Sequence, residues 1–353
     1  MNAKKWFIKG VLSIFMSLCI LAATTVVIDP LFHYHTPLEG LKYSISNQRY
    51  QNDGIVKNFQ YDALITGTSM TENFKTSEFN RLFNVNSVKV PLVGASYKEI
   101  GDMLQRATMT NSDIKYIIWG LDYKRLLDDK DFMMYDNYPT YLYDDNPWND
   151  LNYLLNKDIF IKNTAQVLFY TIIGRDNMDF DVAYNWMDNY EFGKDAVDKI
   201  YQRPERVEKS IFLNREEKIR LEENLEQNVI SVLEKNPNIH FYLFFPPYSI
   251  YYWDKCNQMG MLDYQLETEK RAIELLVEYD NVFLFSFTDN MNLITKMDYY
   301  SDTEHYGEAV NSKMLEWMKK GEYRLTKDNY MDYCRRVREN LMNYNYDSLF
   351  ADI

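Results

Sequence analysis

Cysteine and histidine are scarce in this sequence of 353 residues, which holds three cysteines and four histidines. The histidines are scattered, and no Cys-x-x-Cys motif or mixed Cys/His cluster occurs, which argues against a structural zinc site. Cys19 lies in an apolar run. Whether Cys256 and Cys334 pair depends on a fold that their spacing alone does not determine. We therefore expect a protein that holds no metal and no other cofactor.

Clustered positive charge is also missing. The sequence has 39 lysines and arginines against 52 aspartates and glutamates, and its formal net charge is −13. No basic stripe occurs beyond the N-terminus, so the surface needed to bind a phosphate backbone is lacking, and we expect no nucleic-acid partner. A hydrophobic share of 46% with a charged share of 26% indicates a globular chain.

One long uncharged run, Gly10–Ile28, stands near the N-terminus. A helix of this length, rising about 1.5 Å per residue, crosses a hydrocarbon core of roughly 30 Å. Lys4, Lys5 and Lys9 precede the run. Asp29 follows it, so the positive-inside rule places the N-terminus in the cytoplasm and the rest outside. A cleaved signal peptide is the competing interpretation, but the run is long for one and no Ala-x-Ala site closes it.

These features predict a single-pass protein of the cell membrane. Residues 1–30 would form the cytoplasmic N-terminus and transmembrane anchor, and residues 31–353 an extracytoplasmic domain. A second stretch, Asp158–Arg175, is charged in its first half and apolar in its second. It predicts an amphipathic helix, either packed on the domain or lying at the membrane surface.

Five short apolar runs predict buried strands. They are Tyr61–Thr66, Val85–Val90, Ile114–Gly120, Ile239–Phe245 and Val282–Phe287. Helical patterns lie between or after them, at Thr76–Phe83, Tyr97–Thr108, Asn214–Lys235, Tyr264–Tyr279, Glu308–Lys320 and Thr326–Met342. Alternating strands and helices indicate an α/β fold with a parallel sheet covered on both faces.

Residues 123–213 interrupt this alternation with an acidic, aromatic segment followed by helical patterns. An insertion after the carboxyl end of a strand lies over the edge where such sheets bind ligands, so we interpret it as a lid or substrate subdomain. Its aromatic side chains either line a glycan groove or pack the insertion itself.

A serine follows the first predicted strand in the motif Gly67-Thr68-Ser69-Met70. At a sharp strand-to-helix turn its hydroxyl is exposed, and the helix dipole favours negative charge that develops there. However, Ser69 and Glu72 also fit a capping box, in which the serine has no catalytic role.

Two further loops follow strands. The tetrapeptide from Asp302 to His305 lies between the last strand and the last core helix, and its carboxylate can fix the tautomer of its imidazole. Gly94 follows the second strand, where a glycine lets a backbone N–H approach a substrate oxyanion.

In this order, the three motifs resemble those of the SGNH (GDSL-like) hydrolase superfamily. The resemblance implies a flavodoxin-like parallel sheet of five strands between helices. It also implies Ser69 as nucleophile, His305 as base and Asp302 as the residue that orients the base. The amides of Ser69, Met70 and Gly94 would form the oxyanion hole.

The resemblance covers residues 60–125 and 237–320 and leaves out the insertion 123–213. It departs from the family after the third strand, where many members place an oxyanion-binding asparagine. Here the position is Asp122, whose carboxylate would repel an oxyanion unless it is protonated or turned away. Either the oxyanion hole is built differently here, or Asp122 does another job, such as binding a substrate hydroxyl or ordering its loop.

The anchor, the outward domain and the insertion look like the envelope branch of this superfamily, which includes teichoic-acid D-alanyl transfer and alginate O-acetylation proteins. That likeness implies a serine acyltransferase or esterase acting on a cell-envelope glycan or teichoic-acid-like polymer, beside a multi-spanning O-acyltransferase. Both reactions pass through an acyl-enzyme. The alternative is a catalytically idle module that binds glycan or scaffolds the acyltransferase. The missing asparagine favours it, whereas Ser69 and the Asp302/His305 pair argue against it.

The lysines before the apolar run generate a prediction about topology. A reporter enzyme fused to the C-terminus should be active outside the cytoplasm, because residues after about 30 follow a positive-inside anchor. A fusion that is active only in the cytoplasm would contradict this orientation.

Overall fold

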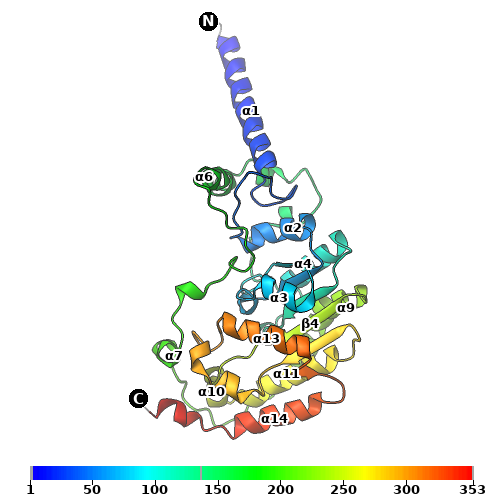
Figure 1. The fold of residues 1–353 in the computed structure, drawn as a ribbon, viewed down its shortest axis with the longest axis vertical. Helices are drawn as coiled ribbons and strands as arrows, with labels where there is room; N and C mark the ends of the chain where they lie inside the picture. Colours follow the sequence, from blue (N-terminus) through cyan, green and yellow to red (C-terminus); the bar gives the residue numbers. More distant parts are fainter. Residues whose placement is uncertain (1–2, 136, 352–353) are drawn as a thin grey trace.

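The computed structural model describes residues 3–135 and 137–351. A mostly parallel sheet lies between helices, and the long helix α1 projects from one end of this body (Figure 1). The strands are β1 Ala63–Thr66, β2 Ser87–Lys89, β3 Tyr116–Gly120, β4 His240–Phe245, β5 Val282–Ser286 and β6 Arg324–Leu325.

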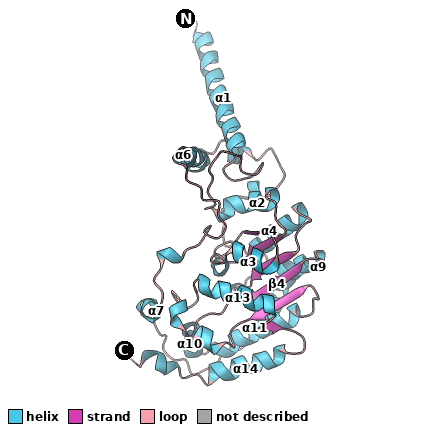
Figure 2. Ribbon diagram, viewed as in Figure 1, coloured by secondary structure: helices cyan, strands magenta, loops and turns pink. Residues whose placement is uncertain are grey.

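The sheet has six strands in the order β2-β1-β3-β4-β5-β6, drawn in magenta in Figure 2. The first five are the predicted strands, and they are parallel. Leu64, Ile117 and Leu243 are wholly buried in them, as expected for strands covered on both faces. The expectation of five strands misses β6, which pairs antiparallel with β5. At two residues, β6 is too short to show an alternating pattern.

Helices cover both faces of the sheet. On one side α4 contacts α8, η6 and α9, and α11 contacts α8 and α14, whereas on the other side α3 contacts α13. The helices outside the insertion are α1 Ala3–Ile28, α2 Gln48–Asn58, η1 Ser69–Thr71, α3 Thr76–Phe83, α4 Tyr97–Thr110, α8 Arg215–Leu225, η6 Glu226–Ile230, α9 Ser231–Lys235, α10 Ile250–Gln258, α11 Leu262–Leu276, α12 Met291–Ile294, η7 Met297–Tyr299, α13 Glu308–Lys320, α14 Tyr330–Met342 and η8 Tyr346–Phe350.

The insertion 123–213 runs along the body as short helices joined by irregular segments. It passes from the end of β3 to the base of α1, where α5 and η4 contact α1, and then returns to α7 and α10 (Figure 1). Its helices are η2 Tyr123–Arg125, η3 Thr140–Leu142, α5 Leu151–Leu154, η4 Ile159–Thr164, α6 Ala165–Ile173, η5 Met187–Asn189 and α7 Lys194–Ile200.

Helix α1 is the one helix in the described part of the chain that is long and apolar enough to cross a membrane. Its large apolar side chains face outward on all sides, and Trp6, Phe15 and Ile20 are each more than half exposed. Such a helix has no core of its own to pack against in this chain, and its length suits a bilayer.

The end of α1 is fixed to the body through Asp29, which is fully buried. One carboxylate oxygen accepts hydrogen bonds from the His33 amide at 3.0 Å and the Tyr153 hydroxyl at 2.7 Å. The other oxygen accepts from the amides of Tyr34 at 2.7 Å and His35 at 3.0 Å. Four donors satisfy the buried charge, so the turn after α1 is held in one conformation.

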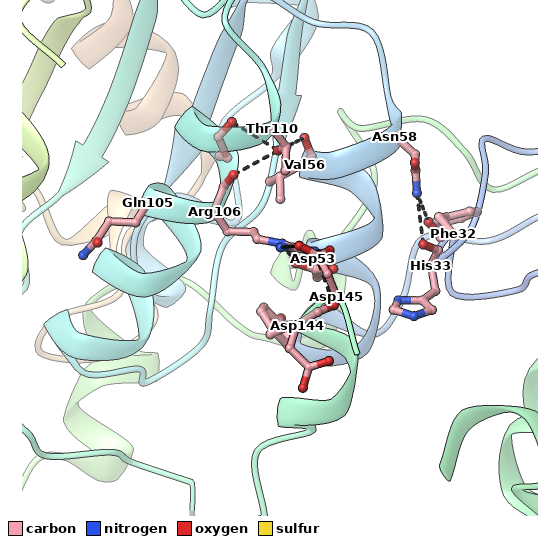
Figure 3. A network of polar contacts seen from close by, with 12 residues as sticks. Phe32, His33, Asp53, Val56, Asn58, Gln105, Arg106, Thr110, Asp144 and Asp145 are labelled. Atoms are coloured by element: carbon pink, nitrogen blue, oxygen red, sulfur yellow. Dashed lines mark hydrogen bonds and ion pairs between the residues drawn. The ribbon is translucent and has the colours of Figure 1, made fainter. Parts of the chain in front are cut away.

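Helix α2 is tied to α4 and to the insertion by Arg106 (Figure 3). The Arg106 Nε donates to Asp53 Oδ1 at 3.1 Å, and its terminal nitrogens donate to Asp145 at 2.7 and 3.1 Å. Asn58, at the end of α2, donates to the carbonyl oxygen of Phe32 at 2.6 Å. Burial raises the pKa of Asp53, while the Arg106 charge acts in the opposite direction.

Replacing Arg106 by alanine should lower the free energy of unfolding by about 3 kcal/mol, because the buried Asp53 carboxylate loses its partner. Chemical denaturation of the detergent-solubilised full chain measures this.

The matched control is Lys115→Ala, which breaks a surface pair with Asp62 at 3.1 Å. Such exposed pairs contribute about 1 kcal/mol or less. Equal losses in the two variants would contradict a stabilising role for the buried Asp53–Arg106 pair.

Candidate active site

The loops after β1 and β3 meet at one edge of the sheet, where the strand order reverses. Gly67 has a φ of +146°, and a Cβ there would lie 2.7 Å from the Thr71 side chain and 3.2 Å from the Gly120 backbone. Only glycine fits this conformation and this close approach. The turn delivers Ser69 to the start of η1, facing the cleft.

Ser69, His305 and Asp302 form a hydrogen-bonded chain. Ser69 Oγ lies 2.9 Å from His305 Nε2, although 236 residues separate them in sequence. His305 Nδ1 lies 2.7 Å from Asp302 Oδ2. Because a carboxylate can only accept, Nδ1 carries the proton, and Nε2 is left to accept the Ser69 hydroxyl proton.

The turn that carries the imidazole is itself ordered by Asp302. Its Oδ1 accepts hydrogen bonds from the amides of Glu304 and His305, both at 2.7 Å. One carboxylate therefore fixes both the backbone and the ring of His305.

The electrostatics of this pair raise the basicity of the imidazole. Burial by itself would lower the pKa of His305, but the hydrogen bond and the charge of Asp302 outweigh it and hold the pKa above its ordinary value of 6.5. Burial by itself would raise the pKa of Asp302. The hydrogen bond and the charge of His305 outweigh this effect and hold the pKa below its ordinary value. At neutral pH the carboxylate is charged and stabilises a protonated imidazole.

The capping-box interpretation of Ser69 does not match the local structure. Thr68, not Ser69, is the N-cap residue of η1, and it makes no side-chain cap hydrogen bond. The Glu72 side chain instead accepts from the Gln48 amide. A complete capping box stands elsewhere, between Ser96 and Glu99 at the start of α4.

Three of the described residues that line the cavity around Ser69 have backbone amides without a partner. Within the described part of the chain, the N–H groups of Ser69, Met70 and Gly94 have no hydrogen-bond acceptor in the protein. Ser69, Met70 and Gly94 line the same cavity, which has a volume of about 370 Å³. These amides thus border the same space as the Ser69 hydroxyl and have no competing partner among the described residues.

Helix α2 holds the loop that carries Gly94. Gln48 Oε1 accepts from the Val93 amide at 2.7 Å, and the Arg49 guanidinium donates to the Val93 carbonyl at 2.6 Å. The Tyr135 hydroxyl donates to the same carbonyl at 3.1 Å, with Arg49 stacked on its ring at 3.2 Å. Sequence reasoning missed these residues, because nothing in α2 marks it as close to the second strand.

The Asp122 carboxylate is engaged by neighbouring loops. Its Oδ2 accepts from the Thr68 hydroxyl at 2.9 Å, and its Oδ1 accepts from the Tyr248 hydroxyl at 2.6 Å and the Lys124 amide at 3.0 Å. These bonds join the segments that follow β1, β3 and β4. Asp122 thus orders the loops, and three donors bind its carboxylate oxygens.

Part of the insertion forms a wall of the cavity. The Trp186 indole nitrogen donates to the Ser69 carbonyl at 3.4 Å, and its ring meets the His305 ring edge-on at 5.6 Å. Phe192 stacks on Trp186, and Tyr190 contacts it edge-on. The sequence places the insertion over this edge of the sheet but does not single out Trp186.

The cavity is also lined by carboxyl groups other than that of Asp302. Burial raises the pKa of Glu72 to about 7, although the hydrogen bond from Gln48 acts in the opposite direction. Glu304, which also lines the cavity, pairs with Lys124 at 2.6 Å. A second basic residue, Arg125, also lines the cavity.

Within residues 3–135 and 137–351, no group of three His, Cys, Asp or Glu side chains is arranged to hold a metal ion. Cys19, Cys256 and Cys334 are free thiols.

No protein-family model matches the chain, and no curated protein matches it in a sequence search. Chemistry at this edge of the sheet is therefore inferred from the geometry of Ser69, His305 and Asp302 and from the amides around them.

Proposed function

We propose that this protein is a membrane-anchored serine acyltransferase or esterase of the SGNH type, which acts on a cell-envelope polymer or glycan outside the cytoplasm. The observation that carries the proposal is the contact of Ser69 with His305 at 2.9 Å and of His305 with Asp302 at 2.7 Å. The unpartnered amides at Ser69 and Gly94 add the second requirement of acyl transfer, a site for the oxyanion.

In the first half of the reaction, Ser69 Oγ attacks the carbonyl carbon of an acyl donor while His305 Nε2 takes the hydroxyl proton. The carbonyl oxygen becomes an oxyanion, which accepts hydrogen bonds from the free amides. When the tetrahedral intermediate collapses, the bond to the leaving group breaks, and His305 returns the proton to that group. An acyl ester on Ser69 remains.

In the second half, a hydroxyl group of the polymer or a water molecule gives its proton to His305 and attacks the carbonyl carbon of the ester. The bond between the acyl group and Ser69 Oγ then breaks, and His305 returns the proton to Ser69. A polymer hydroxyl makes the protein a transferase, and water makes it an esterase. The cavity that Trp186 lines has a volume of about 370 Å³, which is large enough for a small acyl group. Tyr190 beside it supplies an aromatic surface suited to a sugar ring.

The proposed setting rests on α1, whose length and apolar surface suit a single membrane span. The order of the first five strands, with Ser69 where that order reverses, is that of the flavodoxin-like sheets. Both features support the resemblance to envelope members of the superfamily, which work beside a multi-spanning O-acyltransferase.

A fluorophosphonate probe should label the wild-type chain at Ser69, because only an activated serine reacts well. Ser69→Ala should abolish labelling, and His305→Ala should slow it by about 10²–10⁴-fold. Gel fluorescence against time gives the rate.

The matched control is Ser96→Ala, which removes a helix cap. It should lose about 1 kcal/mol of stability and still label. A folded wild-type chain that does not label would favour the idle glycan-binding or scaffold module instead.

The raised pKa of His305 sets the pH dependence that we expect for the reaction rate. The base must be neutral, so kcat/KM for a small activated ester should fall as the pH drops through a value above 6.5. Asp302→Asn removes the charge that stabilises the imidazolium, so the acidic limb should move to lower pH while the rate falls.

Glu72→Gln is the control for this pH profile, because burial raises the pKa of Glu72 to about 7. It should leave the acidic limb in place. If Glu72→Gln moves the limb and Asp302→Asn does not, His305 is not the base that the profile reports.

A further inference from the structure

An unusual apolar surface lies on the insertion, far in sequence from α1. Helix η4 leads directly into α6, and five of their large apolar side chains point into solvent. Ile172 is 83% exposed, more than any of the other four. We call this surface the α6 face, and it consists of Ile161, Leu168, Phe169, Ile172 and Ile173.

The opposite side of the same helix is fixed to the body. Thr164 and Val167 are buried. The Thr171 hydroxyl accepts from the Lys42 amide at 2.9 Å and donates to the Val167 carbonyl at 2.7 Å. The helix therefore cannot roll its apolar side inward, and the α6 face stays outward.

The position of the α6 face indicates what covers it. Figure 1 shows α6 nearly end-on beside the base of α1, so the two helix axes cross steeply. Helix η4 contacts α1 directly. If α1 stands upright in a bilayer, α6 lies along the membrane surface at the depth where α1 leaves it.

Side chains next to the α6 face extend the same exposed surface. Leu151 and Trp148, in and just before α5, are 58% and 85% exposed, and α5 also contacts α1. The exposed cations Lys162 and Arg175 flank the α6 face. Helices at the membrane interface combine an apolar face with tryptophan and flanking basic residues.

We propose that the α6 face is buried in the interfacial layer of the bilayer that α1 spans, as a second membrane contact. This inference rests on the membrane anchoring in the proposed function. A single helix leaves a domain free to rotate about it, whereas two contacts fix which side faces the lipid. The cleft at Ser69 is then held in one orientation toward substrates at the membrane surface.

The test uses the full chain in phosphatidylcholine vesicles with a Cys19→Ser, Cys334→Ser background. Single cysteines replace Ile172 on α6, Phe15 in the middle of α1, and Met331 on α14, and each carries an environment-sensitive fluorophore. Met331 is the matched control, because it is an exposed apolar residue of α14, the helix at the end of the body opposite α1 (Figure 1). Spin-labelled lipids quench a fluorophore that lies in the bilayer.

Quenching at Ile172 and Phe15, with none at Met331, supports the proposal. Quenching at Phe15 but not at Ile172 overturns it while leaving the anchor intact. If Ile172 is then shielded from aqueous iodide only in native membranes, a protein partner covers the α6 face instead. Loss of quenching at Phe15 contradicts the membrane anchor itself and thus the proposed function.

Discussion

Parallel pairing of β1 with β2 on one side and β3 on the other sets the position of the whole site. Leu64 pairs with Val88 in β2 and with Ile117 in β3. Because the three strands run in the same direction, their following loops leave from one edge. Gly67 and Gly120 let the loops approach, since a Cβ on either would lie only 2.7 or 2.9 Å from the Thr71 side chain.

Buried polar groups fix the loops once the strands have brought them together. Asp122 joins three loops through hydroxyl and amide donors, and the Lys89 amine donates to the carbonyls of Glu72 and Phe74 just beyond Ser69. Burial lowers the pKa of Lys89 to about 8. Burying such groups is costly unless every partner is in place, so these contacts favour one conformation over its near alternatives.

Helix α2 connects the end of the body next to α1 with the edge of the sheet that carries Ser69. Gln51 donates to the Pro30 carbonyl at 3.1 Å, close to the turn at Asp29. One turn earlier, Gln48 binds the Val93 amide and so positions Gly94. The position of the loop that carries Gly94 is thereby tied to the segment that follows α1, through hydrogen bonds made by a single short helix.

The sequence by itself determined the five parallel strands, the long apolar helix and the candidate residues Ser69, Asp302 and His305. Hydrophobic runs and residues at strand ends are local patterns, so they can be recognised in the sequence without knowing the rest of the fold. Only the tertiary structure decided that Gln48 and Trp186 reach the site, that Asp122 orders loops, and that β6 extends the sheet. Those contacts join segments far apart in sequence, and their geometry depends on how the strands and helices pack, which no local pattern encodes.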